Sequence, residues 1–221
     1  MVVAFFGTTI LSVIALRFIP VYFTPLMFIR VVQQLSDNRD VRLYHKWVSL
    51  DKISTDLPLA VISSEDQRFL SHHGFDFKAI ETAAKQNAKP NSKRKLGAST
   101  ISQQTAKNVF LWPGRTWLRK GLEAYFTCLI ELMWSKERIM EVYLNSIEMG
   151  DGIYGAASVA ELHFDCMPNE LTREQCALIA ASLPNPIKYN SSKPGPYMKK
   201  RQRRILREMR YIGTWNREKA Y

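Results

Sequence analysis

The chain opens with apolar positions that no charge interrupts. Residues 2–16 (VVAFFGTTILSVIAL) are uncharged, Arg17 follows them, and a second apolar run over residues 18–29 contains two prolines. A membrane helix needs roughly 20 apolar residues, so we predict one near residues 1–19, with the proline-containing run leaving the bilayer. The alternatives are a cleaved signal peptide, which would need a basic start and a small-residue cleavage site, and a buried helix, which would normally show a polar face.

After this segment the apolar positions have helical spacing. Between residues 117 and 133 they recur every three or four positions, and the pattern resumes at Ile139 after a break at Ser135. No internal repeat and no run of alternating strand positions is visible. We therefore predict a mainly α-helical catalytic domain over residues 31–221, behind a membrane anchor and interfacial segment over residues 1–30.

Two helix starts carry a specific signature. Thr100-x-x-Gln103 and Thr172-x-x-Gln175 each precede an apolar stretch and fit a capping box, in which side chain and backbone bond reciprocally. Residues 85–97 (KQNAKPNSKRKLG) are instead polar, basic and non-periodic, so we predict a mobile loop there.

Composition narrows the class of protein. The 221 residues are 46% hydrophobic and carry a net charge of +11, which excludes a disordered or low-complexity chain. Eight basic residues against one acidic residue lie between Lys193 and Arg210, where we predict a final helix with a solvated face. A nucleic-acid binder or a non-catalytic membrane scaffold is the alternative for this segment, but aromatic side chains do not alternate with its charges.

The segment 97–108 (GASTISQQTAKN) gathers polar side chains on one predicted helix. Residues four apart share a helix face, so this helix carries two adjacent stripes of hydroxyls, amides and one ammonium group. Many donors and a positive charge suit a sugar phosphate better than an apolar partner. The two stripes consist of Ser99, Gln103 and Lys107, and of Thr100, Gln104 and Asn108.

Two carboxylates stand out because each lies among apolar residues and near cations: Glu65 and Glu123. That environment is typical of catalytic carboxylates, and a surface salt bridge is the alternative for each. Arg115, Arg119 and Lys120 precede Glu123, and Lys120 shares its helix face. We expect these cations to bind phosphate next to a catalytic carboxylate, with an ordinary ion pair as the alternative for Lys120.

The sequence contains no motif typical of a zinc site or of a nucleotide-binding site. The four histidines form no H-E-x-x-H pair and no glycine-rich phosphate loop occurs, so we predict neither a metal site nor a nucleotide site.

Five segments, in order, resemble the motifs of the peptidoglycan glycosyltransferases that polymerise lipid II. The resemblance covers roughly residues 45–210 and, because no transpeptidase domain follows, is to the monofunctional biosynthetic transglycosylases, which have one N-terminal membrane anchor. The chain departs from the pattern at Gln67, where a basic residue is expected, and at Ser191, where a proline is common. The segments are EDQRFLSHHGFD (65–76), GASTISQQTAKN (97–108), RKGLE (119–123), KERIMEVYLNSIEMGDGIYG (136–155) and ASLPNPIKYN (181–190).

The resemblance implies a lysozyme-like fold and an inverting glycosyl transfer that releases polyprenyl diphosphate. It implies that Glu65 is the general base and Glu123 the second essential carboxylate. The residues implied to bind the donor diphosphate and sugars are Ser99, Thr100, Gln103, Gln104, Lys107, Asn108, Arg115 and Lys120, and those implied to hold the loop that presents Glu65 are Asp66, Phe69, His72 and Gly74.

The same resemblance implies the cellular context. The partners are lipid II, the growing glycan chain, the membrane and other cell-wall synthesis proteins, with no nucleic acid. The location is the bacterial cytoplasmic membrane, crossed once, with the catalytic domain on the outer side. No tightly bound cofactor is implied, although family members often work better with Mg²⁺ or Mn²⁺. A peptidoglycan-cleaving enzyme of the same lysozyme-like class is the alternative; it would need an acid for the leaving sugar oxygen rather than a diphosphate clamp.

Overall fold

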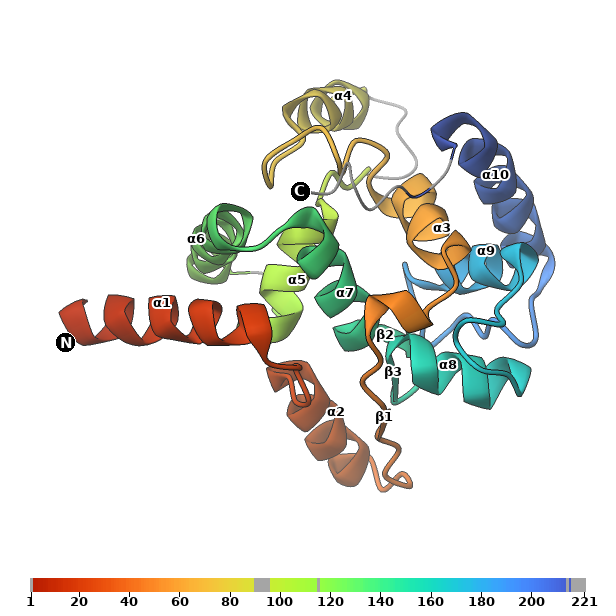
Figure 1. Ribbon diagram of the computed structural model, residues 1–221, viewed down its shortest axis with the longest axis horizontal. Helices are drawn as coiled ribbons and strands as arrows, with labels where there is room; N and C mark the ends of the chain where they lie inside the picture. The colour runs from red at the N-terminus through yellow and green to blue at the C-terminus, as the bar shows by residue number, and fades with distance from the viewer. Residues whose placement is uncertain (1, 90–95, 115, 214, 216–221) are drawn as a thin grey trace.

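Helices dominate the computed structural model, which describes residues 2–89, 96–114, 116–213 and 215 (Figure 1). The predicted mainly α-helical class is therefore confirmed. The helices are α1 (Val2–Phe18), α2 (Pro25–Ser36), the short 3-10 helix η1 (Leu50–Lys52), α3 (Asp56–Glu65), α4 (Phe77–Asn87), α5 (Ile101–Phe110), α6 (Trp117–Met133), α7 (Lys136–Ser146), α8 (Gly155–Phe164), α9 (Arg173–Ser182) and α10 (Pro196–Ile212).

A small sheet, absent from the sequence prediction, lies beside α8. It contains β1 (Tyr44–His45), β2 (Glu148–Gly150) and β3 (Ile153–Tyr154) in the order β1-β3-β2, with β1 parallel and β2 antiparallel to β3. Strands of two or three residues are too short to show an alternating pattern. This sheet joins the segment after α2 to the turn between α7 and α8.

The predicted helix starts are confirmed. Thr100 and Thr172 each form both halves of a capping box, at α5 and α9. Ser135, predicted as a break, is the N-cap of α7, because its side chain accepts a hydrogen bond from the backbone N–H of Arg138 at 3.1 Å. The helix predicted over residues 117–133 is α6, with the same bounds.

The core lies around α5 and α7 in the middle of the molecule. Helix α5 packs against α6 and α7, whereas α3 packs against α9 and α10 on the other side (Figure 1). Met140, Tyr143 and Leu144 of α7 have no exposed surface. Packing thus fixes α3, which ends at Glu65, and α5, which carries several of the candidate polar residues.

The first helix corrects one expectation. We predicted a membrane-crossing helix near residues 1–19, but α1 has 17 residues and ends before Pro20, since a proline disfavours helical backbone at the residue before it. Over the described parts of the chain, no helix combines the length and the apolar character that a bilayer crossing requires. Helix α1 extends away from the body (Figure 1) and packs on α6, where Thr9 Oγ1 and Tyr125 Oη are 2.8 Å apart.

The bounds of the predicted loop and of the final helix differ from the predicted ones. Lys85 belongs to α4, which continues to Asn87, and residues 90–95 lie outside the described parts. The Asn87 side chain exchanges two hydrogen bonds with the backbone of Leu96, of 2.8 and 3.0 Å, so the two sides of this segment are tied together. Helix α10 begins at Pro196 rather than Lys193.

Candidate active site

Glu65 ends α3, and its carboxylate accepts hydrogen bonds on both oxygens. Ser64 Oγ donates to Oε1 at 2.9 Å, and the guanidinium of Arg201, from α10, donates to the same oxygen at 3.3 Å. Gln104 Nε2, from α5, donates to Oε2 at 3.3 Å. Tyr143 Oη donates to the carbonyl oxygen of the Gln104 amide at 3.2 Å and so fixes which way the amide points. Four helices together orient one carboxylate.

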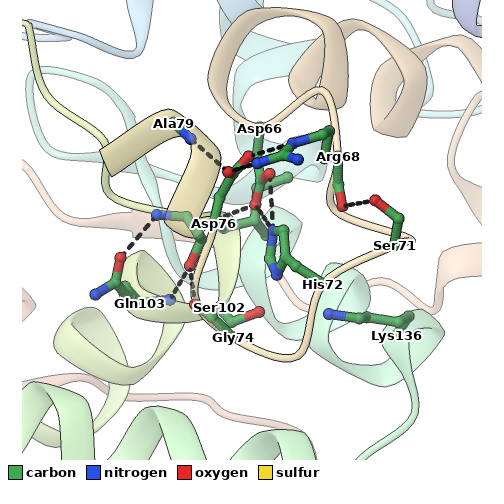
Figure 2. Close-up of polar contacts among 12 residues, drawn as sticks. Asp66, Arg68, Ser71, His72, Gly74, Asp76, Ala79, Ser102, Gln103 and Lys136 are labelled. Carbon is green, nitrogen blue, oxygen red and sulfur yellow. Dashed lines mark hydrogen bonds and ion pairs between the residues drawn. The ribbon is translucent and has the colours of Figure 1, made fainter. Parts of the chain in front are cut away.

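The loop after Glu65 is held by Asp66, as Figure 2 shows. Its carboxylate accepts hydrogen bonds from His72 Nε2 at 2.9 Å and from the backbone N–H of Ile101 at 3.0 Å. Gly74 adopts φ +86°, and a Cβ there would lie 2.8 Å from a methyl group of Thr127. These contacts agree with the structural role that the resemblance implies for the loop residues.

A cavity of about 640 Å³ opens beside Glu65, between α3, α4 and α10. A second cavity of about 540 Å³ lies between α2, α5 and α6. Ser99 lines both cavities, and Gln104, which contacts Glu65, lines the second. The structure therefore brings Glu65 and the cationic region near Glu123 to one hollowed surface, with the start of α5 between them.

Glu123 lies buried at the second cavity between two cations of its own helix. Arg119 Nη1 donates to Oε2 at 2.6 Å, and the ammonium group of Lys120 forms an ion pair with Oε1. The side chains of Glu123 and Arg119 are 4% and 9% exposed, whereas that of Lys120 is 43% exposed. The predicted pairing of Lys120 with Glu123 is present, and the half-exposed ammonium group also lines the cavity.

Lys107 adds a third cation to this wall. Burial lowers the pKa of its ammonium group; the nearby Glu123 carboxylate opposes that shift, and Arg119 and Lys120 add to it. A lysine held among cations gains stability from an added anion, because the anion compensates for lost hydration and for repulsion. The wall is therefore suited to bind phosphate.

Four other residues were predicted to bind the donor, and three of them lie in the described parts of the chain. Gln103 is buried, and its side-chain oxygen accepts a hydrogen bond from the backbone N–H of Thr100, which completes the cap of α5. Thr100 lines the first cavity but donates its hydroxyl to the carbonyl of Gly74 at 2.7 Å. Asn108 is buried and lines the second cavity. Arg115 lies outside the described residues.

Arg201 is a site residue that the sequence analysis missed, because we interpreted its helix as a solvated face. One signal marks it: Arg201 lies between Met198 and Ile205 at helical spacing, and both of these are buried. It therefore belongs to the inner face of α10, whereas most of the neighbouring cations are exposed.

The donor set does not fit a resident divalent ion. In the described ranges, no group of three or more His, Cys, Asp or Glu side chains could hold a metal. The second cavity is lined by two carboxylates, Glu123 and Glu148, and each is already paired with a cation, Glu148 with Arg30.

Comparison with known proteins supplies the family. The transglycosylase family model matches residues 31–210. A biosynthetic peptidoglycan transglycosylase of Bacteroides thetaiotaomicron is 62% identical over 212 residues, which are 96% of this chain and 85% of the relative. Those of Bdellovibrio bacteriovorus and Caulobacter vibrioides are each 52% identical, over 93% and 89% of this chain and 81% and 82% of the relatives. The chain therefore belongs to the transglycosylase family.

Proposed function

We propose that this chain polymerises lipid II into linear β-1,4-linked glycan strands of peptidoglycan, with Glu65 as the general base. It is a peptidoglycan glycosyltransferase, as its family membership indicates. The observation that carries the catalytic assignment is the position of Glu65: its oriented carboxylate borders one cavity and is bridged by Gln104 to a second, cationic cavity. The lysozyme-like fold that the sequence motifs imply is part of this proposal.

In the proposed reaction the 4-hydroxyl of the acceptor GlcNAc attacks the anomeric carbon of the donor MurNAc. A sugar hydroxyl is a weak nucleophile, and a positioned base that accepts its proton contributes roughly 100- to 10,000-fold. Ser64, Gln104 and Arg201 fix the Glu65 carboxylate for that transfer. A direct displacement breaks the bond to the diphosphate as the new bond forms, so the α-linked donor yields a β-linked product.

The leaving diphosphate gains negative charge as its bond to the sugar breaks. Cations placed beforehand stabilise charge that develops in a transition state, and Lys107 and Lys120 line the cavity that would receive this group. Glu123 holds Arg119 and Lys120 in position through its two oxygens. The second carboxylate thus acts through the cations that it positions.

Lys120→Ala is expected to weaken donor binding and turnover together, because it removes a half-exposed cation from the cavity. A hydrogen bond to a charged group contributes about 1.5–3 kcal/mol, which corresponds to a loss of roughly 10- to 100-fold in kcat/KM for lipid II. Steady-state polymerisation measures it. Lys85→Ala, which breaks an exposed ion pair with Glu81 on α4, is the matched control. An unchanged rate in Lys120→Ala would show that Lys120 only forms an ion pair with Glu123 and does not bind the donor.

Lys107→Arg is expected to extend activity to higher pH. Because the pKa of Lys107 is lowered by burial, its charge is lost at a lower pH than that of a solvent-exposed lysine, and kcat/KM for lipid II should fall as the pH rises through that value. A guanidinium stays charged, so the variant should keep its alkaline activity even if its neutral activity is reduced. The measurement is the pH profile of kcat/KM for both proteins. If both lose activity over the same alkaline range, that loss belongs to a group other than Lys107.

We also propose that the enzyme sits on the outer side of the cytoplasmic membrane, where its lipid-linked substrates are. The envelope is where peptidoglycan is made, and an apolar surface supports this location. Large apolar side chains are exposed on and between α1, α2 and the start of α6; they include Val3, Phe18, Phe23, Phe28, Trp117 and Leu118. Helix α2 is amphipathic, and helices of this kind bury their apolar face in the headgroup region.

A glycan-cleaving enzyme is the second candidate, since it also uses a glutamate in a groove. Purified protein should convert labelled lipid II into polymer. Shortening of preformed glycan strands, without polymer from lipid II, would favour cleavage. Binding to an oligonucleotide that weakens steeply with salt, with lipid II left intact, would instead favour the basic helix α10 as a nucleic-acid surface.

A further inference from the structure

The lining of the second cavity also includes an arginine from α2. Arg30 lines this cavity. Its Nε donates to Glu148 Oε2, on β2, at 3.2 Å, and its Nη1 donates to Gln33 Oε1 at 3.0 Å. The side chain of Arg30 is 31% exposed, whereas that of Glu148 is 6% exposed. Part of the guanidinium is thus held by a buried partner and part remains accessible from the cavity.

Glu148 is costly to bury and is well placed to fix Arg30. Burial raises the pKa of its carboxyl, and the charge of Arg30 and the backbone N–H of Gly152 oppose that shift. The other titratable groups near it are Tyr154 and Asp151, on the adjoining strand and turn. A buried carboxylate with one cationic partner holds that partner in a defined position.

The charges around this cavity do not balance. Among the described lining residues, four cations face two carboxylates, which leaves an excess of two positive charges. The phosphates of a diphosphate diester carry about one negative charge each at neutral pH, so this excess matches such a ligand. The cations are Arg30, Lys107, Arg119 and Lys120, and the carboxylates are Glu123 and Glu148.

Apolar side chains line the cavity next to Arg30. Leu26 is one helical turn before Arg30 on α2, so the two share the face that lines the cavity. Trp112 and Pro113, which follow α5, lie on the same lining. Phe28 of α2 is exposed instead. Helix α2 therefore presents a cation and an apolar side chain to the cavity and a further apolar side chain to the surroundings.

We propose that Arg30 is a diphosphate-binding residue of the donor site, carried by α2 and positioned by Glu148. The inference rests on the proposed function, because the diphosphate is the leaving group of that reaction. Arg30 would contact the phosphates on the side where the polyprenyl chain leaves them, with Leu26 and Trp112 against the first units of the chain. The donor site is then closed by a helix from the membrane-facing part of the molecule.

The experiment measures diphosphate binding without turnover, by calorimetric titration of the whole chain with farnesyl diphosphate, a monoester that represents the released polyprenyl diphosphate and is more negatively charged than the diester donor. Arg30→Gln is expected to weaken binding roughly 10- to 100-fold. It also leaves Glu148 unpaired, so a second variant, Arg30→Gln with Glu148→Gln, removes both charges and keeps the net charge of the cavity. Arg39→Gln is the control, since Arg39 forms an ion pair with Asp151 and does not line the cavity. Thermal unfolding is recorded for every variant.

The double variant separates contact from charge balance. If Arg30 holds phosphate, the double variant regains the unfolding temperature of the wild type and still binds the diphosphate weakly. Wild-type affinity in the double variant, or in Arg30→Gln alone, would overturn the proposal and leave Arg30 as the counter-ion of Glu148. Failure of the wild type to polymerise lipid II, with farnesyl diphosphate binding intact and dependent on Arg30, would count against the proposed function alone.

Discussion

The Glu65→Gln variant is expected to lose polymerisation by roughly 100- to 10,000-fold while it still binds lipid II. Glutamine keeps the size of the side chain and one acceptor oxygen, so Ser64 and Arg201 retain a partner, but it cannot take the proton of the acceptor hydroxyl. The cations that would bind the diphosphate line the other cavity. The effect should therefore appear in kcat, with a dissociation constant for lipid II close to that of the wild type.

The control for this variant is Glu161→Gln. Glu161 is an exposed residue of α8 that forms an ion pair with Lys46 and lines neither cavity. It should polymerise lipid II at the wild-type rate. Substantial activity in Glu65→Gln would remove Glu65 from the role of base. Loss of both binding and activity would show instead that Glu65 supports the shape of the groove.

Local rules of the chain were enough to predict the mainly helical class and the starts of several helices. A capping box needs only residues three apart, so Thr100 with Gln103 and Thr172 with Gln175 marked the starts of α5 and α9 from sequence alone. The sheet depended on pairing between strands about a hundred residues apart, with Tyr44 opposite Ile153. A contact of that range leaves no periodic signal in so short a strand.

The same difference between local and long-range contacts separates the site residues that were predicted from those that were missed. Residues of one helix, such as Gln104 and Asn108, were predicted together because a period of four placed them on one face, and both line the second cavity. Gln103 shared that pattern, yet its amide caps α5. The partners from other helices were missed: spacing could place Arg201 on the inner face of α10, but it does not show that Arg201 meets Glu65 or that Arg30 meets Glu148. Such partners become visible only when packing brings α10 and α2 to the site.

The N-terminal helix shows how composition and length can disagree. The sequence lacks charges over residues 2–16, which favoured a membrane crossing, but the helix stops at Phe18, two residues before Pro20. Its polar atoms also have partners in the rest of the protein: Trp134 Nε1 donates to the carbonyl of Val13 at 2.8 Å. The middle of α1 thus contacts the rest of the protein, whereas its side chains Val3, Leu11 and Phe18 remain exposed.

Glu123→Ala is expected to reduce stability and activity together. Arg119 is buried, and its Nε has no hydrogen-bond partner among the described residues, so Glu123 is the anion that compensates for burying its charge. Removing one partner of a buried ion pair costs about 3–5 kcal/mol, which lowers the unfolding temperature of a domain of this size by roughly 6–20 °C. Polymerisation should fall as well, because Lys120 loses the carboxylate that positions it. Thermal unfolding and lipid II turnover measure the two effects.

A double variant, Arg119→Met with Glu123→Met, separates the two losses. Replacing both members of a buried pair by apolar side chains is often neutral for stability, and methionine is compatible with a helix. The unfolding temperature of the double variant should return most of the way to that of the wild type. Its polymerisation rate should stay low, because one cation of the wall is gone and Lys120 has lost its partner. Wild-type turnover in the double variant would mean that Glu123 only neutralises Arg119. Full stability of Glu123→Ala would mean that Arg119 finds another partner, and that the cationic wall of the donor cavity does not depend on Glu123.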